Sequence, residues 1–291
     1  MSFLKLKCRA KINLAIDVLG KRKDNYHLVE MIMQTIDLYD YVSIEEINSG
    51  IVIESNNPYV PLDSKNIAYK AVQLIKDKFN IDRGIKIKIE KNIPIAAGLA
   101  GGSTNAGGVL IGLNKLWDLK LSKDEIMDLG LKLGADVPFC IMGGAALAQG
   151  IGEKLTPING LDNIHILICK PDISVSTAWV YNSLNMSKVN KRPNIEFLIG
   201  CLEKKDIHSL STNMANVLEC VTETKYTEIT EIKRKMLEYK ALGSMMSGSG
   251  PTVFGIFDNF NYAKYAKEKL GELYKQTYLI KSYEGGIEVE G

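Results

Sequence analysis

The sequence predicts an α+β protein, because strand and helix patterns are mixed along the chain and lack the regular alternation of βαβ units. Three observations carry this prediction. Apolar and polar residues alternate over the first eighteen positions, helical stripes begin only near residue 64, and glycine-rich loops occur at 94–108 and 247–255. The 291 residues are enough for two modest domains, which we place at 1–160 and 161–291.

The first element is a long strand. Apolar residues occupy the even positions from Leu4 to Val18, and polar residues hold the odd positions up to Asn13. Period two is typical of a half-buried strand, so Lys11 and Asn13 should point together, away from the apolar face. A lysine in that setting is usually solvated. After a polar loop, residues 31–45 continue as strand.

The remaining elements follow from periodicity. Helices are expected at 64–79, 104–117, 122–134, 196–204, 228–239 and 262–274. Strands are expected at 84–94, 145–150 and 164–171, on both sides of a glycine turn within 241–257, and at the end of the chain. The polar stretch 182–194 is expected to be a loop.

Composition narrows the function classes. The net charge is +2, from 36 basic and 34 acidic residues, which gives no electrostatic reason to expect nucleic acid or membrane as a partner. Five scattered cysteines form no C-x-x-C pair, and they fit reduced thiols in a cytoplasmic protein better than disulfides or zinc. We find neither a signal peptide nor an apolar window long enough to span a membrane.

The strongest local signal is PIAAGLAGGSTNAGG, residues 94–108, which joins a strand to a helix. Small residues let backbone N–H groups approach a ligand closely, and a helix N-terminus favours an anion. The loop has no Walker lysine before Ser103 and no well-spaced G-x-G-x-x-G. It predicts a phosphate-binding turn, with a tightly packed structural turn as the alternative.

Two further signals are weaker alone. The second glycine cluster, 247–255, is also explained by a hairpin turn, although two such loops could line one nucleotide cleft from both sides. Tyr26 and His27 could stack on and hydrogen-bond a base, but a loop Tyr-His pair is usually incidental.

Asp136 is the single charge between residues 133 and 148. Carboxylates avoid apolar surroundings unless they are paired. One interpretation is a helix N-cap, with Pro138 in the first turn; the other is a catalytic acid whose partner lies elsewhere in the chain.

In order along the chain, AKINLAI, PIAAGLAGGSTNA and MSGSGPTVFG resemble the three motifs of the GHMP kinases. The fuller set AKINL, NYH, GLAGGSTNA, LGADVPF and GGAALAQGIGE is similar to the branch that acts on a cytidine-diphosphate-linked methylerythritol. The resemblance spans residues 9–257 and implies a two-domain α+β fold with the active site in the interdomain cleft. The implied reaction is ATP-dependent phosphorylation of the substrate's 2-hydroxyl, in the non-mevalonate isoprenoid pathway.

The resemblance also implies roles for individual residues. Lys11 and Asp136 would be catalytic, the lysine lying beside the carboxylate and keeping it ionised. The substrate would be bound by Asn13, Tyr26, His27, Thr177 and Tyr181, the two tyrosines enclosing the cytosine. ATP would be bound by Pro94, Ile95, Ala96, Ala97, Gly98, Leu99, Ala100, Gly101, Gly102, Ser103 and Thr104, with Asn66 and Lys91 nearby. Mg²⁺ would be held chiefly by phosphates and water, with Ser103 as a candidate ligand and no dedicated metal site.

The chain departs from the family pattern at three places. Asp24-Asn25 replaces the usual Asp-Gly, and Ala100 and Thr104 stand where Gly and Ser are common. These changes are small. Three alternatives stay open: a mevalonate- or homoserine-type GHMP kinase, a catalytically silent ligand-binding regulator on the same scaffold, and an RNA-binding module, which the near-zero net charge disfavours. The sequence carries no signal for an oligomeric state.

Overall fold

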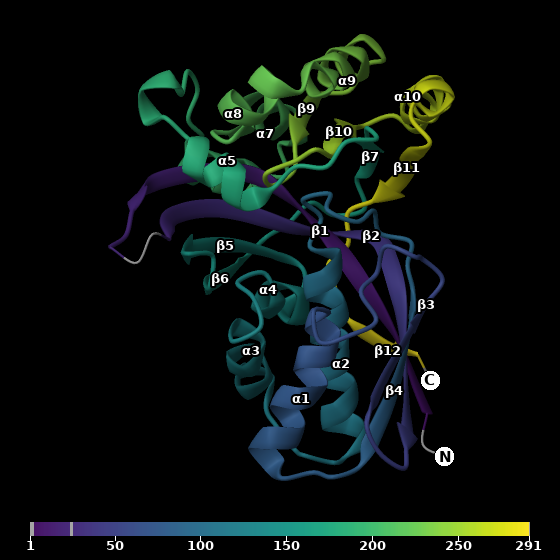
Figure 1. Cartoon of the computed structure of the whole chain (residues 1–291). Helices are drawn as coiled ribbons and strands as arrows, with labels where there is room; N and C mark the ends of the chain where they lie inside the picture. Colours follow the sequence, from purple (N-terminus) through teal and green to yellow (C-terminus); the bar gives the residue numbers. More distant parts are fainter. Residues whose placement is uncertain (1–2, 24–25, 291) are drawn as a thin grey trace.

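The computed structural model describes residues 3–23 and 26–290 (Figure 1). The strands are β1 (Phe3–Lys21), β2 (His27–Ile47), β3 (Ile51–Ser55), β4 (Gly84–Glu90), β5 (Ala145–Gly150), β6 (Lys154–Ile158), β7 (His165–Lys170), β8 (Ala215–Asn216), β9 (Gly243–Met246), β10 (Val253–Phe257), β11 (Gln276–Lys281) and β12 (Glu288–Glu290). The helices are α1 (Ile67–Phe79), α2 (Gly101–Leu116), α3 (Lys123–Leu131), α4 (Val137–Met142), α5 (Thr177–Ser183), a 3₁₀ turn (Met186–Lys188), α6 (Ile195–Glu203), α7 (Ile207–Asn213), α8 (Glu219–Lys225), α9 (Thr227–Glu238) and α10 (Phe260–Leu273).

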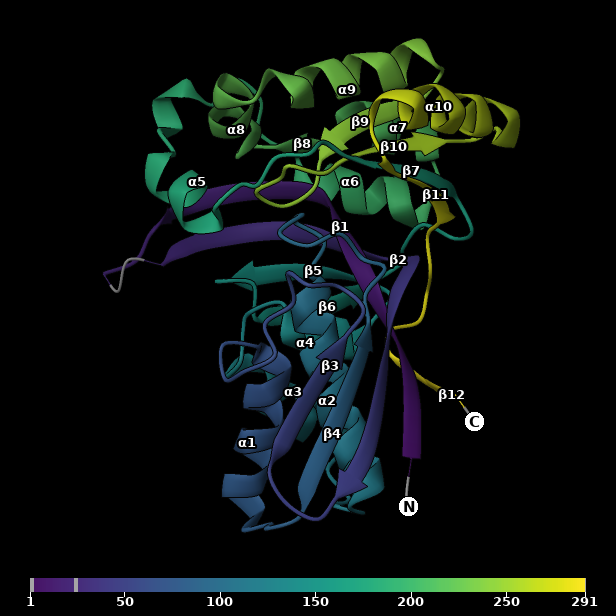
Figure 2. The same cartoon turned by 45° about the vertical axis from the view of Figure 1, so that its right-hand side comes forward.

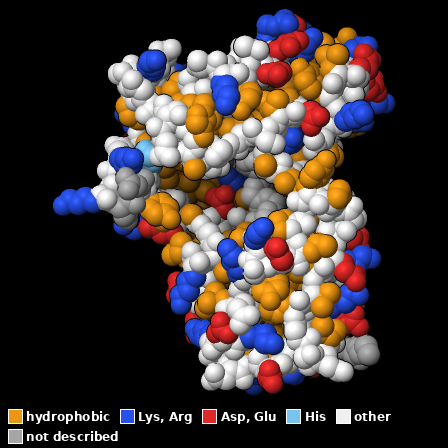
Figure 3. Space-filling view, in the orientation of Figure 1, with side chains coloured by type: hydrophobic (Ala, Val, Ile, Leu, Met, Phe, Trp, Pro, Cys, Tyr) orange, Lys and Arg blue, Asp and Glu red, His pale blue; other side chains and the backbone are white. Residues whose placement is uncertain are grey.

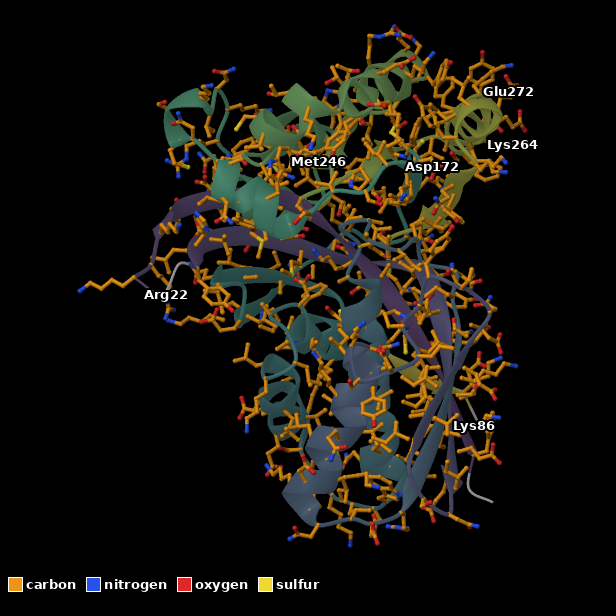
Figure 4. The ribbon with its side chains drawn as sticks, in the orientation of Figure 1. Arg22, Lys86, Asp172, Met246, Lys264 and Glu272 are labelled. Atoms are coloured by element: carbon orange, nitrogen blue, oxygen red, sulfur yellow. The ribbon has the colours of Figure 1, made fainter. Side chains whose placement is uncertain are left out.

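A long antiparallel hairpin of β1 and β2 organises the first half of the molecule. The eight-stranded sheet has the order β12–β1–β2–β4–β3, with β5 on β2, β6 on β5 and β8 on β1. β2 pairs with β4 through residues 41–47 and with β5 through residues 29–34. In Figure 4, Arg22 marks the projecting tip of this hairpin and Lys86 marks β4 in the lower half.

The hairpin is buried more completely than the alternating pattern predicts. Every residue from 8 to 18 is buried, because different layers cover successive parts of β1. Leu6 and Cys8 pack with residues of α1 and α2, whereas Ile12 and Leu14 pack with residues of the second sheet. The prediction of a half-buried strand was therefore wrong in its burial, although the strand itself is confirmed.

The second sheet has the order β11–β7–β10–β9, and helices cover both its faces (Figure 2). Leu167 packs with residues of α9 and α10, and Ile168 packs with residues of α6 and α7. Both clusters also include residues of β1 and β2, so the hairpin shares its core with the second sheet. The short strands β8 and β12 come after residue 160 in the sequence, but they pair with β1 in the first sheet. The first sheet therefore contains residues from both sides of the proposed domain boundary at residue 160.

The long elements match their predictions, as do the short strands β5 and β7, whereas several short helices were missed. The six expected helices and the β9–β10 turn are present, and α4 begins where the N-cap interpretation of Asp136 put a helix, but α5, α7 and α8, each of seven residues, were not predicted. All five cysteines lie in described residues and are free. Across the described ranges, no helix has the length and apolar character needed to cross a membrane.

Candidate active site

A cleft of about 930 Å³ lies between the two halves of the molecule, and Figure 3 shows the corresponding hollow. Its walls are formed by the β1–β2 hairpin, the glycine-rich loop 94–103, helix α5 and the second glycine loop. The cleft therefore brings together segments that are more than two hundred residues apart in the sequence, such as Lys11 and Ser249.

The first glycine-rich loop leads from β4 into α2. Its backbone is left-handed at Ala96, Gly98 and Ala100, with φ values of 50°, 72° and 56°. Ala100 occupies the N-cap of α2 and has no side chain that can cap it. The N–H groups of the first turn are consequently left for a ligand, and the helix dipole makes an anion the favoured one.

The two glycine loops touch each other. Ser247 Oγ donates a hydrogen bond to the Gly98 carbonyl at 3.0 Å. A Cβ at Gly98 would lie 2.2 Å from the Ser247 carbonyl oxygen, so only glycine fits there. Gly248 and Ser249 line the same cleft as residues 94–103, which is the two-sided arrangement that the sequence suggested.

Lys11 and Asn13 lie at the centre of the cleft. They are only 5% and 0% exposed, so the expectation of a solvated lysine was wrong. The Lys11 backbone N–H donates to the Leu99 carbonyl at 3.2 Å, which ties β1 to the glycine-rich loop. Lys11 Nζ donates to Asn13 Oδ1 at 2.8 Å and lies 3.8 Å from Asp136 Oδ2.

Asp136 stands at the N-cap of α4, but its carboxylate makes no capping hydrogen bond. Its backbone carbonyl accepts from the Cys140 N–H at 3.1 Å, and Pro138 lies in the first turn. The side chain is 36% exposed and faces the Lys11 ammonium across the cleft. The cap position thus explains where Asp136 lies, whereas its carboxylate remains available for other chemistry.

His27 and Tyr181 form one end of the cleft, together with Tyr26. The His27 and Tyr181 rings are 5.2 Å apart, with a tilt of 36°, and Tyr26 is 59% exposed. Burial, reinforced by the charge of Lys21, lowers the pKa of His27, which favours a neutral imidazole. Burial also raises the pKa of Tyr181, with a smaller contribution from the Asp136 charge. The Asp24-Asn25 turn lies outside the described residues.

The opposite end of the cleft contains Asn66 and Lys91. The Asn66 side chain caps α1, because its Oδ1 accepts from the Ala68 N–H at 2.9 Å. Lys91 Nζ hydrogen-bonds and ion-pairs with Asp40 Oδ2. A Cβ at Gly101 would lie 2.7 Å from Lys91 Nζ, which puts this ammonium beside the first residue of α2.

Every predicted site residue except Thr104 lines the cleft. Thr104 is fully buried in the second turn of α2. Thr177 lines the cleft at the start of α5, and its hydroxyl is 2.9 Å from that of Ser249. The cleft is also lined by residues that were not individually predicted as site residues: Tyr59, Asn105, Ile151, Asn182, Gly248 and Ser249. Asn105 lies in the first glycine-rich stretch, Ile151 in the GGAALAQGIGE motif, and Gly248 and Ser249 in the second glycine cluster, whereas Tyr59 and Asn182 carried no signal.

Comparison with known proteins identifies the family of the chain. The GHMP kinases N terminal domain matches residues 66–144, and the GHMP kinases C terminal domain matches residues 198–276. A protein of Clostridioides difficile (strain 630), named 4-diphosphocytidyl-2-C-methyl-D-erythritol kinase, is 57% identical over 100% of this chain and 99% of its own length. A protein of the same name from Alkaliphilus metalliredigens (strain QYMF) is 56% identical, covering 97% of this chain and 98% of its own.

Solved structures show the same fold. A crystal structure of 4-(cytidine 5'-diphospho)-2C-methyl-D-erythritol kinase superposes with a TM-score of 0.83 at 29% identity, covering 97% of this chain and 100% of that one. Homoserine kinase from Cytophaga hutchinsonii gives a TM-score of 0.80 at 18% identity, covering 100% and 98%. On the strength of the full-length relatives, this chain belongs to the 4-diphosphocytidyl-2-C-methyl-D-erythritol kinases, within the GHMP kinase family.

Proposed function

We propose that the chain transfers the terminal phosphate of ATP to the 2-hydroxyl of 4-diphosphocytidyl-2-C-methyl-D-erythritol, giving the 2-phosphate and ADP. This reaction is a step of isoprenoid synthesis by the methylerythritol phosphate route. The observation that carries the proposal is the Lys11–Asp136 pair, 3.8 Å apart between the glycine-rich loop and the His27–Tyr181 ring pair. A cytoplasmic location is part of the proposal and is supported by the five free thiols.

In this proposal Asp136 accepts a hydrogen bond, and then the proton, from the 2-hydroxyl. The Lys11 ammonium faces both the Asp136 carboxylate and the phosphoryl group in transfer. Phosphoryl transfer has a loose transition state, so positioning and charge neutralisation supply most of the rate enhancement. Asn13 supports Lys11 through its 2.8 Å hydrogen bond, which fixes the direction of the ammonium.

The glycine-rich loop would hold the ATP phosphates through the backbone N–H groups of residues 98–103 and the N-terminus of α2. The left-handed turns at Gly98 and Ala100 and the uncapped first turn of α2 support this assignment. Within the described ranges, no three acidic, histidine or cysteine side chains are grouped as a metal site. Mg²⁺, which neutralises phosphate charge in such reactions, would be held chiefly by phosphates and water, with Ser103 as a candidate ligand.

The cytosine would lie between Tyr26 and Tyr181, with His27, which lines the same part of the cleft beside Tyr181, at the edge of the base. A neutral His27 offers one donor and one acceptor, which suits the mixed edge of a cytosine. The lowered pKa of His27 supports that form. Thr177, at the start of the same helix as Tyr181, would contact the substrate beside the ring.

The relatives named for the cytidylyl substrate favour this proposal over a mevalonate- or homoserine-type kinase. The homoserine kinase structure is only 18% identical and shares the fold alone. A silent binding protein is disfavoured because the Lys11–Asp136 pair is intact and faces the cleft.

A coupled ADP-release assay tests the proposal. The purified chain is supplied with MgATP and, in separate reactions, with the cytidylyl substrate, mevalonate or homoserine. We expect ADP release above the ATPase background only in the reaction that contains the cytidylyl substrate. Release with mevalonate or homoserine but not with the cytidylyl substrate would refute the proposed substrate, and no release with any of them would refute the proposed activity.

A further inference from the structure

Asp40, in the middle of β2, is a fully buried carboxylate that does not line the cleft. A buried carboxylate is costly unless several hydrogen bonds and an opposite charge compensate for its lost hydration. Asp40 is compensated on both oxygens. The groups that compensate Asp40 are therefore held in place by its carboxylate, close to the cleft.

The two oxygens of Asp40 hold different things. Oδ1 accepts from the backbone N–H groups of Asn92 and Ile93, at 2.7 and 2.8 Å. Oδ2 accepts from the Asn105 amide at 2.9 Å and from Lys91 Nζ. One oxygen therefore anchors the chain as it leaves β4, and the other holds two polar side chains.

The two side chains held by Oδ2 both line the cleft at its phosphate end. Lys91 comes from the segment just before the glycine-rich loop, and its side chain is only 6% exposed. Asn105 lies in the second turn of α2 and is 3% exposed. Lys91 Nζ lies beside Gly101, where the free N–H groups of α2 begin. A cation and a helix N-terminus thus meet at one point.

We propose that Asp40 is a positioning residue for the ATP phosphates, acting through Lys91 and Asn105. Its carboxylate fixes the ammonium and the carboxamide against the N-terminus of α2, so that both are in place before the nucleotide binds. Asp40 itself does not touch the nucleotide. This inference rests on the proposed function for the identity of the nucleotide, and it concerns only the phosphate end of the cleft.

The groups around Lys91 also affect the pKa of its ammonium. Burial lowers the pKa of Lys91, and the Asp40 charge opposes that effect. Among the described residues, the buried thiol of Cys8 also acts on Lys91, and burial raises the pKa of this thiol well above its usual range. The loss of the Asp40 charge would therefore lower the pKa of Lys91 further, and the ammonium would lose its proton at a lower pH.

Asp40→Asn is the informative substitution because the two oxygens have separate partners. The remaining carbonyl can keep both backbone N–H groups, whereas the new NH₂ group cannot accept from Lys91 or Asn105. We expect the KM for ATP, and the Kd for a non-hydrolysable ATP analogue measured by calorimetry, to rise roughly tenfold or more. The KM for the cytidylyl substrate should stay within about twofold, because the base end makes no contact with Asp40.

The double variant Asp40→Asn/Lys91→Met guards against misfolding, since it removes both buried charges and keeps similar volumes. If Asp40 acts through Lys91, the double variant binds the analogue about as weakly as Lys91→Met alone. Glu46→Gln is the matched control: Glu46 is also a β2 carboxylate, but it binds Arg83 and Trp117 away from the cleft, and its variant should keep both KM values.

Analogue binding is also measured as the pH is raised from about 7 to about 9. We expect the Asp40→Asn variant to lose affinity at a lower pH than the wild type, and the double variant to lose this pH dependence. The inference is overturned if Asp40→Asn keeps wild-type analogue binding, if both KM values rise equally, or if the two substitutions act additively. Analogue binding needs no turnover, so failure of the cytidylyl assay alone would refute the proposed function and leave this inference tested on its own.

Discussion

The two ends of the cleft are constructed differently. At the proposed phosphate end, residues 94–103 and the N-terminus of α2 line the cleft, with Lys91 held by buried Asp40. At the proposed base end, recognition would depend on the side chains of Tyr26, His27 and Tyr181, of which Tyr26 is 59% exposed. Backbone recognition tolerates substitution as long as the turn is kept, whereas side-chain recognition is lost with the side chain. We therefore expect the phosphate end to supply affinity for ATP and the base end to supply substrate specificity.

The largest effect is expected on kcat, from substitutions of Asp136 and Lys11 between the two ends of the cleft. Asp136→Asn and Lys11→Met should each lower kcat by roughly 10²–10⁴-fold, because they remove the proton acceptor or the facing charge. Calorimetry should still detect ATP binding, since the glycine-rich loop is untouched. Asp37→Asn serves as the control because Asp37 pairs with Arg9 outside the cleft. Turnover near the wild-type rate in either of the first two variants would rule out the assigned roles.

The base end is tested by Tyr181→Ala. Loss of a stacking ring costs about 1–3 kcal/mol per base, so the KM for the cytidylyl substrate should rise roughly tenfold while the KM for ATP stays the same. Phe260→Ala is a matched control, since Phe260 also lies beside a histidine ring, at 5.4 Å from His165. A larger change in the KM for ATP than for the cytidylyl substrate would mean that the two ends are assigned the wrong way round.

A smaller effect is expected from pH. Because the pKa of His27 is lowered, the imidazole is neutral near pH 7 and gains a proton only below its ordinary value of about 6.5. The KM for the cytidylyl substrate should be flat above that value and rise a few-fold at lower pH, while the KM for ATP does not follow. His27→Gln should remove the acid rise.

His165→Gln is the control for this pH profile. Burial lowers the pKa of His165 as well, but this residue lies outside the cleft. The assignment of His27 fails if His165→Gln removes the acid rise and His27→Gln keeps it.

The smallest effect is expected on the free energy of unfolding, from a substitution in the glycine-rich loop at the phosphate end. Ala100 has a left-handed φ of 56°, a conformation that costs a non-glycine residue about 1 kcal/mol. Ala100→Gly should raise the free energy of unfolding by up to about 1 kcal/mol, measured by urea denaturation, with the KM for ATP unchanged. Destabilisation would show that the Ala100 methyl group contributes packing that outweighs the backbone strain.

The fold was predictable where periodicity extends over many residues. β1 and α1, α2, α9 and α10 follow from spacing alone, whereas α7 and α8 are seven residues each and too short for a clear stripe. The burial of Lys11 was not predictable, because alternation describes one strand and says nothing of the layers that later cover its polar face. Asp40 was missed for the same reason: its partners are supplied by residues more than fifty positions away.

The site was predictable in part. The spacing of small residues at 94–108 indicates a phosphate loop through general physics, since backbone N–H groups and a helix end need few side chains. The pairing of Lys11 with Asp136, and of His27 with Tyr181, came only from the resemblance, because nothing in local spacing reports contacts across such separations. Tyr59 and Asn182 line the cleft without any sequence signal.

The central claim is that the cleft presents the substrate's 2-hydroxyl to Asp136 and the ATP phosphates to the glycine-rich loop at the same time. The most direct test is phosphorus NMR of the product formed by the purified chain from MgATP and the cytidylyl substrate. We predict one new phosphate monoester, on the 2-hydroxyl, formed in equal amount with ADP, and formed roughly 10²–10⁴-fold more slowly by the Asp136→Asn variant. A monoester on another hydroxyl, or ADP formed without a phosphorylated product, would contradict the claim.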